Sequence, residues 1–281
     1  MNEEIKRTHL YHAEATALYA DLKLPLTQDV GPQAFVKLSE QGGYLAHHAE
    51  RYRLSGVLSF SSAYTQVAGN RDVKPGHGWS TLATSVVEHL NVLDVVTADR
   101  VVAQVATEHP LVGYVPSVSF LGTRFENLKI AGHPVKLDLD LNILGEKPGN
   151  DAPYSKDSGF IQRVTSQYER LREHRELSAD ILERYNQPPS SSGNQESIEC
   201  SLVNQAGGSY PGKSFGHVID VPNFGKIYLA TLRVEQSDSH TPTGVPRKTL
   251  INLTMIECHM GCLAAGRAGM GNTVTNGSSN P

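Results

Sequence analysis

Apolar residues alternate with polar residues along most of this chain, except in one stretch where they recur at helical spacing. The alternation is strictest at residues 136–142, where three leucines share one face of a predicted strand and Asp138 and Asp140 share the other. Between residues 155 and 187 the apolar residues instead follow the period of a helix, opposite arginines and glutamates. This pattern predicts a mainly β fold, a β-sandwich or a short β-solenoid, with a helical insertion at residues 155–187.

Other strands are predicted on both sides of the insertion. Residues 9–26 alternate in part. One face of that stretch is expected to carry Tyr11, Ala13, Ala15, Ala17 and Tyr19. Residues 87–92 and 125–130 repeat one order of apolar and polar residues, 38 positions apart. A solenoid needs about three copies or more, so two similar half-buried hairpins explain the repeat better.

The chain is expected to form a single β-rich domain over residues 1–281. Strand character resumes at residues 198–203, 216–221, 226–234 and 249–257, after a connector rich in Pro and Ser. Neither side of the insertion has a self-contained pattern, so both sides are expected to share one core. Residues 272–281 are rich in Gly, Asn and Ser and are predicted to be a disordered tail.

Charge and composition argue against two kinds of partner. The net charge is −4 and no cluster of Lys and Arg stands out, which disfavours nucleic acid. No run approaches the roughly 18 consecutive apolar residues of a transmembrane helix.

The charged N-terminus has no apolar segment behind it, so no signal peptide is predicted. The compartment stays open from sequence: the protein is cytoplasmic, a signal has been removed, or export follows a non-classical route.

Residues 207–214 match the phosphate-loop pattern G-x-x-x-x-G-K-[ST]. In such a loop, backbone N–H groups at the start of a helix bind the phosphate. The residues that follow include Gly216, Pro222 and several β-branched side chains, which disfavour a helix. We therefore predict a hairpin loop and no bound nucleotide.

Cysteine and histidine do not form a complete metal-binding pattern. Cys258, His259 and Cys262 read C-H-x-x-C, which lacks the second close pair of ligands that structural zinc takes. His217 or Cys200 would have to complete such a site across a sheet. The odd number of cysteines favours reduced thiols, with one disulfide left open as an alternative.

Catalytic patterns are also incomplete. Asp138 and Asp140 would lie about 7 Å apart on one strand face, a spacing that suits glycoside hydrolysis, but a solvated strand face explains them better. His47 and His48 are adjacent and would face opposite sides of a strand. The nucleophile elbow G-x-S-x-G does not occur. No catalytic, cofactor-binding or metal-binding residue is assigned, and no cofactor is expected.

Two stretches resemble a known protein family. Residues 95–101 follow the V-x-T-A-D-x-V step of the bacterial surface proteins called choice-of-anchor P, and residues 125–135 follow that family's n-L-x-v-x-G-x-x-V element. Residues 253–271 are similar in style to its last strand. The resemblance covers about half the chain. It implies a β-rich extracellular or envelope protein and carries over no functional residue. No signal peptide or anchor of that family is recognised here.

Two functional hypotheses follow. The leading one is a non-enzymatic structural or interaction protein, envelope-associated or self-assembling, because exposed strand edges can pair with other copies or with another envelope protein. The alternative is a carbohydrate-binding or carbohydrate-active β protein, in which exposed Trp79, Tyr114 and Tyr210 stack on sugar rings.

Overall fold

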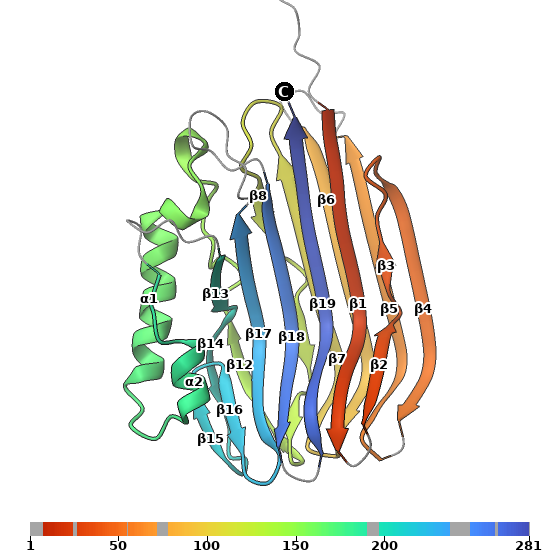
Figure 1. The fold of residues 1–281 in the computed structure, drawn as a ribbon, viewed down its shortest axis with the longest axis vertical. Coiled ribbons are helices and arrows are strands. Elements are labelled where there is room, and N and C mark those ends of the chain that lie inside the picture. Colours follow the sequence, from red (N-terminus) through yellow and green to blue (C-terminus); the bar gives the residue numbers. More distant parts are fainter. Residues whose placement is uncertain are drawn as a thin grey trace, which may run out of the picture.

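Two antiparallel sheets pack face to face in the computed structural model, which describes residues 8–24, 27–54, 56–71, 78–189, 197–236, 248–261 and 264–280 (Figure 1). Strands account for 62% of the described residues and helices for 11%, so the fold is mainly β, as predicted. The sheets form the layers of a sandwich and not a solenoid. No helix among the described residues is long and apolar enough to cross a membrane.

The nine-stranded sheet contains the first and last strands of the chain. Its order is β15-β16-β17-β18-β19-β1-β2, with β13 beside β17 and β3 beside β1. Its strands are β1 (Thr8–Leu24), β2 (Gln28–Gln33), β3 (Val36–Lys37), β13 (Ser197–Ser201), β15 (Lys213–Phe215), β16 (Val218–Val221), β17 (Gly225–Gln236), β18 (Thr249–Gly261) and β19 (Ala265–Asn280).

The eight-stranded sheet has the order β11-β10-β7-β6-β5-β4, with β8 and β9 also beside β7. Its strands are β4 (Gly43–Leu54), β5 (Leu58–Arg71), β6 (Trp79–Val92), β7 (Val96–His109), β8 (Ser117–Ser119), β9 (Arg124–Glu126), β10 (Lys129–Ile130) and β11 (His133–Pro134). A separate pair is formed by β12 (Lys136–Leu139) and β14 (Val203–Gly207).

The repeated segments of the sequence lie on opposite sides of β7. Val87 and Phe125 both pair with Val101. At the other end of the repeat, Val92 and Ile130 both pair with Val96. The repeat therefore reflects two segments that meet the same strand from its two edges.

The two α-helices of the described residues fall within residues 155–187. They are α1 (Ser158–Arg172) and α2 (Ala179–Arg184), and short 3-10 turns at Gly149–Asp151 and Tyr154–Lys156 precede them. The carboxylate of Asp157 accepts the backbone N–H of Phe160 at 2.7 Å and so caps α1. Phe160, Val164 and Leu171 form part of the buried face of α1, at the spacing that the sequence indicated. The side-chain amide of Gln167 bonds the backbone of Ser201 and ties α1 to β13.

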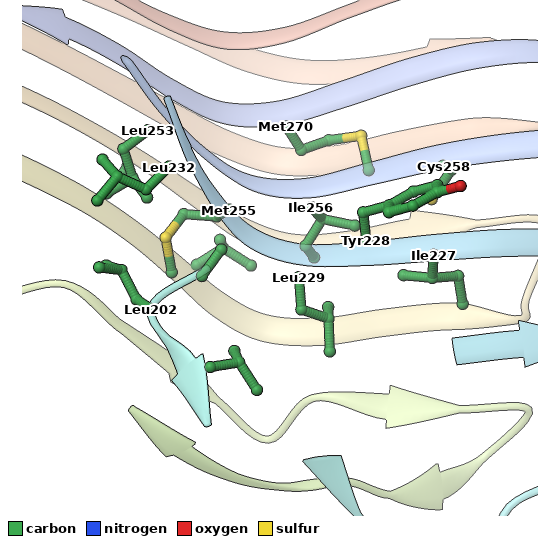
Figure 2. Close-up of a cluster of buried hydrophobic side chains, with 14 of the residues drawn as sticks. Leu202, Ile227, Tyr228, Leu229, Leu232, Leu253, Met255, Ile256, Cys258 and Met270 are labelled. Carbon is green, nitrogen blue, oxygen red and sulfur yellow. The ribbon is translucent and has the colours of Figure 1, made fainter. Parts of the chain in front are cut away.

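The main core lies between the two sheets and continues under the helices. Figure 2 shows part of it, with Leu229, Leu253 and Met255 completely buried. A smaller apolar cluster includes Tyr11, Val67 and Trp79. Burial of this apolar area is the main term that stabilises the sandwich.

A line of backbone irregularities crosses both sheets. In each of eight long strands, the residue on this line is left out of the pairing, and we call these eight residues the kink row. They are Arg51, Ser61, His89 and Asp99 in the eight-stranded sheet and Ala17, Gly271, Met255 and Ala230 in the nine-stranded sheet. Four of them, in alternate strands, have positive φ angles of 45° to 63°.

The predicted face of β1 is wrong at Tyr19, because the alternation of the strand changes at the kink row. Tyr11, Ala13, Ala15 and Ala17 are buried as expected, but Tyr19 is 40% exposed. Consecutive residues Ala17 and Leu18 are both fully buried, so the alternation changes phase between them. Tyr19 therefore points away from the core.

The prediction of a disordered tail is wrong for residues 272–280. They form the end of β19. Asn280 of this strand still pairs with Thr8 of β1, and Thr275 pairs with Ile251 of β18. Backbone pairing with β1 along this whole stretch, and with β18 up to Thr275, holds a segment whose Gly and Asn content alone favours disorder. Pro281 lies outside the described residues.

Candidate functional site

The edge strand β4 is the most open feature of the sandwich. Among the described residues it pairs with β5 alone, and it is the outermost strand of its sheet (Figure 1). It has twelve residues and contains neither Pro nor Lys. By contrast, the terminal strands β15 and β11 have three and two residues, and the six-residue β2 contains Pro32. Proteins usually protect edges with short strands, Pro, charged side chains such as Lys, or irregularities. In β4 the acidic and arginine side chains and the irregularity begin only at Glu50, so residues 43–49 have none of these devices.

Side chains of β4 are exposed on both faces. Residues 43–48 are all exposed, and the exposed fractions of Tyr44 and Leu45 reach 61% and 46%. The hydroxyl of Tyr44 lies 3.0 Å from that of Tyr64, and Nε2 of His48 lies 3.1 Å from Oγ of Ser62. These contacts hold β4 against β5, and no strand of the described ranges pairs with its outer edge.

The backbone groups of β4 alternate in direction. The hydroxyl of Thr65, in β5, lies 3.5 Å from the carbonyl oxygen of His47, so that carbonyl points towards β5. In an antiparallel strand the N–H and C=O of each residue point to the same edge, and the edge alternates along the strand. The backbone groups of Tyr44, Ala46, His48 and Glu50 therefore point outward.

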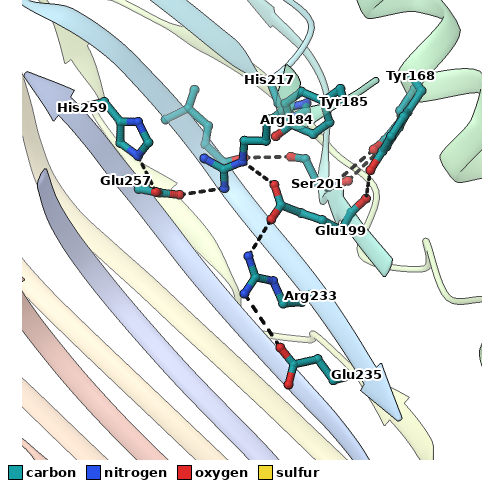
Figure 3. Close-up of polar contacts among 12 residues, drawn as sticks. Tyr168, Arg184, Tyr185, Glu199, Ser201, His217, Arg233, Glu235, Glu257 and His259 are labelled. Atoms are coloured by element: carbon teal, nitrogen blue, oxygen red, sulfur yellow. Dashed lines mark hydrogen bonds and ion pairs between the residues drawn. The ribbon is translucent and has the colours of Figure 1, made fainter. Parts of the chain in front are cut away.

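A second feature is a network of charged side chains that fixes α2 to the nine-stranded sheet. Figure 3 shows Arg184 between two carboxylates, 2.5 Å from Glu199 and 2.9 Å from Glu257. The guanidinium also lies over the ring of Tyr228, 4.2 Å from its centroid. Nε2 of His259 contacts the carboxylate of Glu257 at 2.5 Å. One cation thus joins α2 to β13, β17 and β18.

The charges in this network compensate one another. Burial disfavours the charged form of Glu257, but the hydrogen bond to His259 and the charge of Arg184 outweigh it and lower the pKa of Glu257 to about 2. Burial raises the pKa of Tyr228 to about 12, against the opposing charge of Arg184. Each strongly perturbed group has a partner, as expected of an anchor that holds secondary structure elements together.

A polar cleft of about 620 Å³ lies between α1 and the strands β14 and β15. Its lining includes Asp138, Arg170, His174, Asn204, Gln205 and His217. At the cleft, Nε2 of His217 is hydrogen-bonded to the Tyr185 hydroxyl at 2.8 Å, and burial lowers the pKa of His217 to about 4. A smaller cavity of about 410 Å³ shares Gln167, Arg170 and Asn204 with it. The two form one polar groove along α1.

The phosphate-loop match does not precede a helix. Residues 213–215 form strand β15. A Cβ on Gly212 would lie 2.2 Å from the carbonyl oxygen of Asp220, so this glycine serves close strand packing. The ammonium of Lys213 pairs with Glu176. The match is thus part of a β connection, as the sequence indicated.

The candidate carboxylates and metal ligands are dispersed. Asp138 lines the cleft, with Oδ2 accepting a 3.4 Å hydrogen bond from Asn204, whereas Asp140 lines the adjoining cavity. Cys200 and Cys258 are buried free thiols, and Cys262 lies outside the described residues. Within the described ranges, no group of three or more His, Cys, Asp and Glu side chains could hold a metal ion.

The three aromatic residues predicted to stack on sugar rings, Trp79, Tyr114 and Tyr210, do not form an exposed sugar-binding surface. Trp79 is only 7% exposed and stacks on His9 with ring centroids 4.9 Å apart, so its expected exposure was wrong. It begins β6 at the sheet interface, where burial of a large ring is favourable. Tyr114 and Tyr210 are half-buried, and the Tyr210 hydroxyl contacts the Ala206 carbonyl at 3.4 Å.

Comparison with known proteins gives one match. A family model described as a domain of unknown function, DUF8256, matches residues 9–235. No curated protein and no solved structure matches the chain.

Proposed function

Because the chain belongs to the DUF8256 family, a domain of unknown function, we propose a role from its own geometry: a non-enzymatic interaction protein that associates through the β4 edge. The observation that carries this proposal is a twelve-residue edge strand without Pro or Lys and with both faces exposed over residues 43–48. Such an edge is a template for another strand, which backbone hydrogen bonds would hold.

The polar network supports an anchoring role over a catalytic one. Arg184 and Glu257 have the perturbed, partly buried character of catalytic groups, but each is already paired within the protein. Perturbed ionisable groups of this kind also occur in structural ion pairs. We therefore place the function on the edge and not on the network.

Light scattering coupled to size-exclusion chromatography tests the proposal. The wild-type protein should show a mass that rises with concentration. The Ala46→Pro variant should remain monomeric, because it removes an outward N–H and leaves the pairing with β5 intact. The Ala46→Thr variant keeps that N–H and should still associate. A wild-type protein that stays monomeric at high concentration contradicts the proposal.

We further propose that this association takes place at a bacterial surface. The support is the resemblance of residues 95–101 and 125–135 to choice-of-anchor P proteins. Cell fractionation with protease treatment of intact cells tests it, since a surface protein is degraded before the cells lyse. Protection until lysis would contradict the surface location and leave the edge proposal standing.

Carbohydrate binding is a second candidate, and the groove along α1 favours it. Asp138, Asn204, Gln205 and Arg170 supply acceptors and donors for sugar hydroxyls, and Arg170 forms no ion pair within the described part of the chain. A glycan array should show binding that is lost in Asn204→Ala and kept in Gln28→Ala. An array without hits would exclude this candidate.

A further inference from the structure

We propose that the partner of β4 is a second copy of this chain, paired antiparallel about a two-fold axis at His47. This inference rests on the proposed function and specifies the partner and the register. It follows from the kink row, the direction of the backbone groups and the order of side chains along residues 43–50.

The kink row limits which part of β4 can accept a strand. Arg51 has a φ of 52° and faces Ser61, which in turn faces His89 of the next strand, without forming a regular pair. Each of the four long strands of this sheet thus matches its neighbour's irregularity. A regular incoming strand can follow β4 only on one side of Arg51, and residues 43–50 are the longer side.

The backbone directions restrict the axis further. In an antiparallel ladder, two opposed residues both point their N–H and C=O towards each other or both point them away. Outward groups belong to Tyr44, Ala46, His48 and Glu50, so even-numbered residues must oppose even-numbered residues. A two-fold axis must therefore pass through a residue and not between two residues.

The side chains favour His47 as that residue. With the axis there, Leu45 opposes Ala49 on one face and Tyr44 opposes Glu50 on the other, which places a phenol beside a carboxylate. With the axis at Ala46, Leu45 would oppose His47 and Glu50 would lack a partner strand residue within β4. Directly opposed pairs are the units that stabilise a sheet.

A second copy of this chain offers an edge strand that matches the first one. Its own residues 43–50 have the same length and the same kink at the end. The antiparallel arrangement places every acidic Glu50 opposite a tyrosine, whereas a parallel in-register copy would bring Glu50 close to Glu50. The contact would be isologous and would close as a dimer, joining two eight-stranded sheets into one.

Cysteine cross-linking determines the register. Single variants at positions 44–50 are made in a Cys262→Ser background, in which Cys200 and Cys258 are buried. Oxidation should give the most dimer for His47→Cys, because Cβ atoms opposed at the axis lie close enough for a disulfide. Leu121→Cys, in a turn and 72% exposed, is the control for random collision.

Two outcomes overturn the inference. In the first, the yield of disulfide-linked dimer is highest at Ala46→Cys or at another position that is not His47. In the second, no variant gives more dimer than the Leu121→Cys control. If Ala46→Pro still abolishes association in those cases, the edge function stands and only the two-fold register fails. If association is absent altogether, both fail.

A charge reversal provides an independent readout in solution. Glu50→Lys removes the contact with the partner's Tyr44 twice per dimer, once on each side of the axis. The dissociation constant should rise roughly two- to thirtyfold, as expected for two cross-strand pairs. An unchanged constant, measured by analytical ultracentrifugation on a variant with a wild-type circular dichroism spectrum, overturns the register.

Discussion

At the scale of single residues, the kink row is the least ordinary feature of the backbone. Arg51, His89 and Ala230 adopt a left-handed conformation that costs a residue with a Cβ about 1–2 kcal/mol. Only Gly271 occupies this conformation without that cost. The row is therefore held in place by the packing of the two sheets.

Gly271→Ala should be destabilising. Its φ is 63°, and an added Cβ would lie 3.2 Å from Met255 and 3.4 Å from Val101 of the other sheet. We expect a loss of about 1–2 kcal/mol in the free energy of unfolding, measured by urea denaturation. The control is Gly31→Ala, where no atom lies within 4 Å of the added Cβ. Equal effects of the two variants would contradict the packing described for the kink row.

Two buried histidines should make the fold sensitive to acid. Burial, aided by the charges of His9 and Lys147, lowers the pKa of His109 to about 3, and burial lowers that of His9 to about 4. An unfolded histidine titrates near about 6.5, so below that pH the unfolded chain binds protons that the folded chain does not. The free energy of unfolding should therefore fall as the pH drops from about 6.5 towards 4, by up to about 1.4 kcal/mol per pH unit for each histidine.

His109→Leu tests this assignment. Neither ring nitrogen of His109 has a hydrogen-bond partner within the described residues, so an apolar replacement leaves no polar group stranded. Urea denaturation at pH 7, 6 and 5 should give a shallower loss of stability for the variant than for the wild type. Parallel curves would show that His109 does not contribute to the acid sensitivity.

At the scale of elements, Arg184 should be essential for holding α2 on the sheet. Removal of Arg184 in an Arg184→Met variant leaves Glu199 and Glu257 partly buried without their shared cation, which should cost about 3–5 kcal/mol. Arg233→Met is the matched control, because Arg233 pairs with the same Glu199 but is 48% exposed, and such exposed pairs contribute about 1 kcal/mol or less. Chemical denaturation compares the two, and similar losses would refute the anchoring role of Arg184.

The last strand provides a second test at this scale. A chain that ends at Gly271 would lose the part of β19 that pairs with both β1 and β18. Its melting temperature should fall by about 10 °C or more. The matched control, removal of Pro281 alone, should have little effect. An unchanged melting temperature after the longer truncation would mean that residues 272–280 contribute nothing to the sheet.

The sequence predicted element types better than their positions in the sheets. The two-residue alternation of apolar residues predicted a mainly β chain. Their helical spacing placed the helical stretch at 155–187, where α1 and α2 lie. The kink row has no glycine signature apart from Gly271, so the phase change that exposes Tyr19 and divides β4 could not be anticipated. The alternation in β4 is interrupted at Arg51, and no bounds were predicted for that strand.

At the scale of the whole molecule, both candidate sites depend on topology. Edge status is a property of strand order, and nothing in residues 43–54 indicates that β4 pairs on one side only. The cleft combines Asp138, Arg170 and Asn204 from β12, α1 and β14, which are far apart in the sequence. Asp138 was noted for its strand alternation, but its neighbours in the cleft were not predictable from spacing.

Hydrogen exchange of individual β4 amides, followed by NMR at low and high protein concentration, tests the central claim most directly. The amides of Ala46, His48 and Glu50 point outward and should exchange rapidly in the dilute protein and slowly in the concentrated one. The amides of Leu45 and His47 bond β5 and should be protected at both concentrations. Rapid exchange of the outward amides at every concentration would contradict association through this edge.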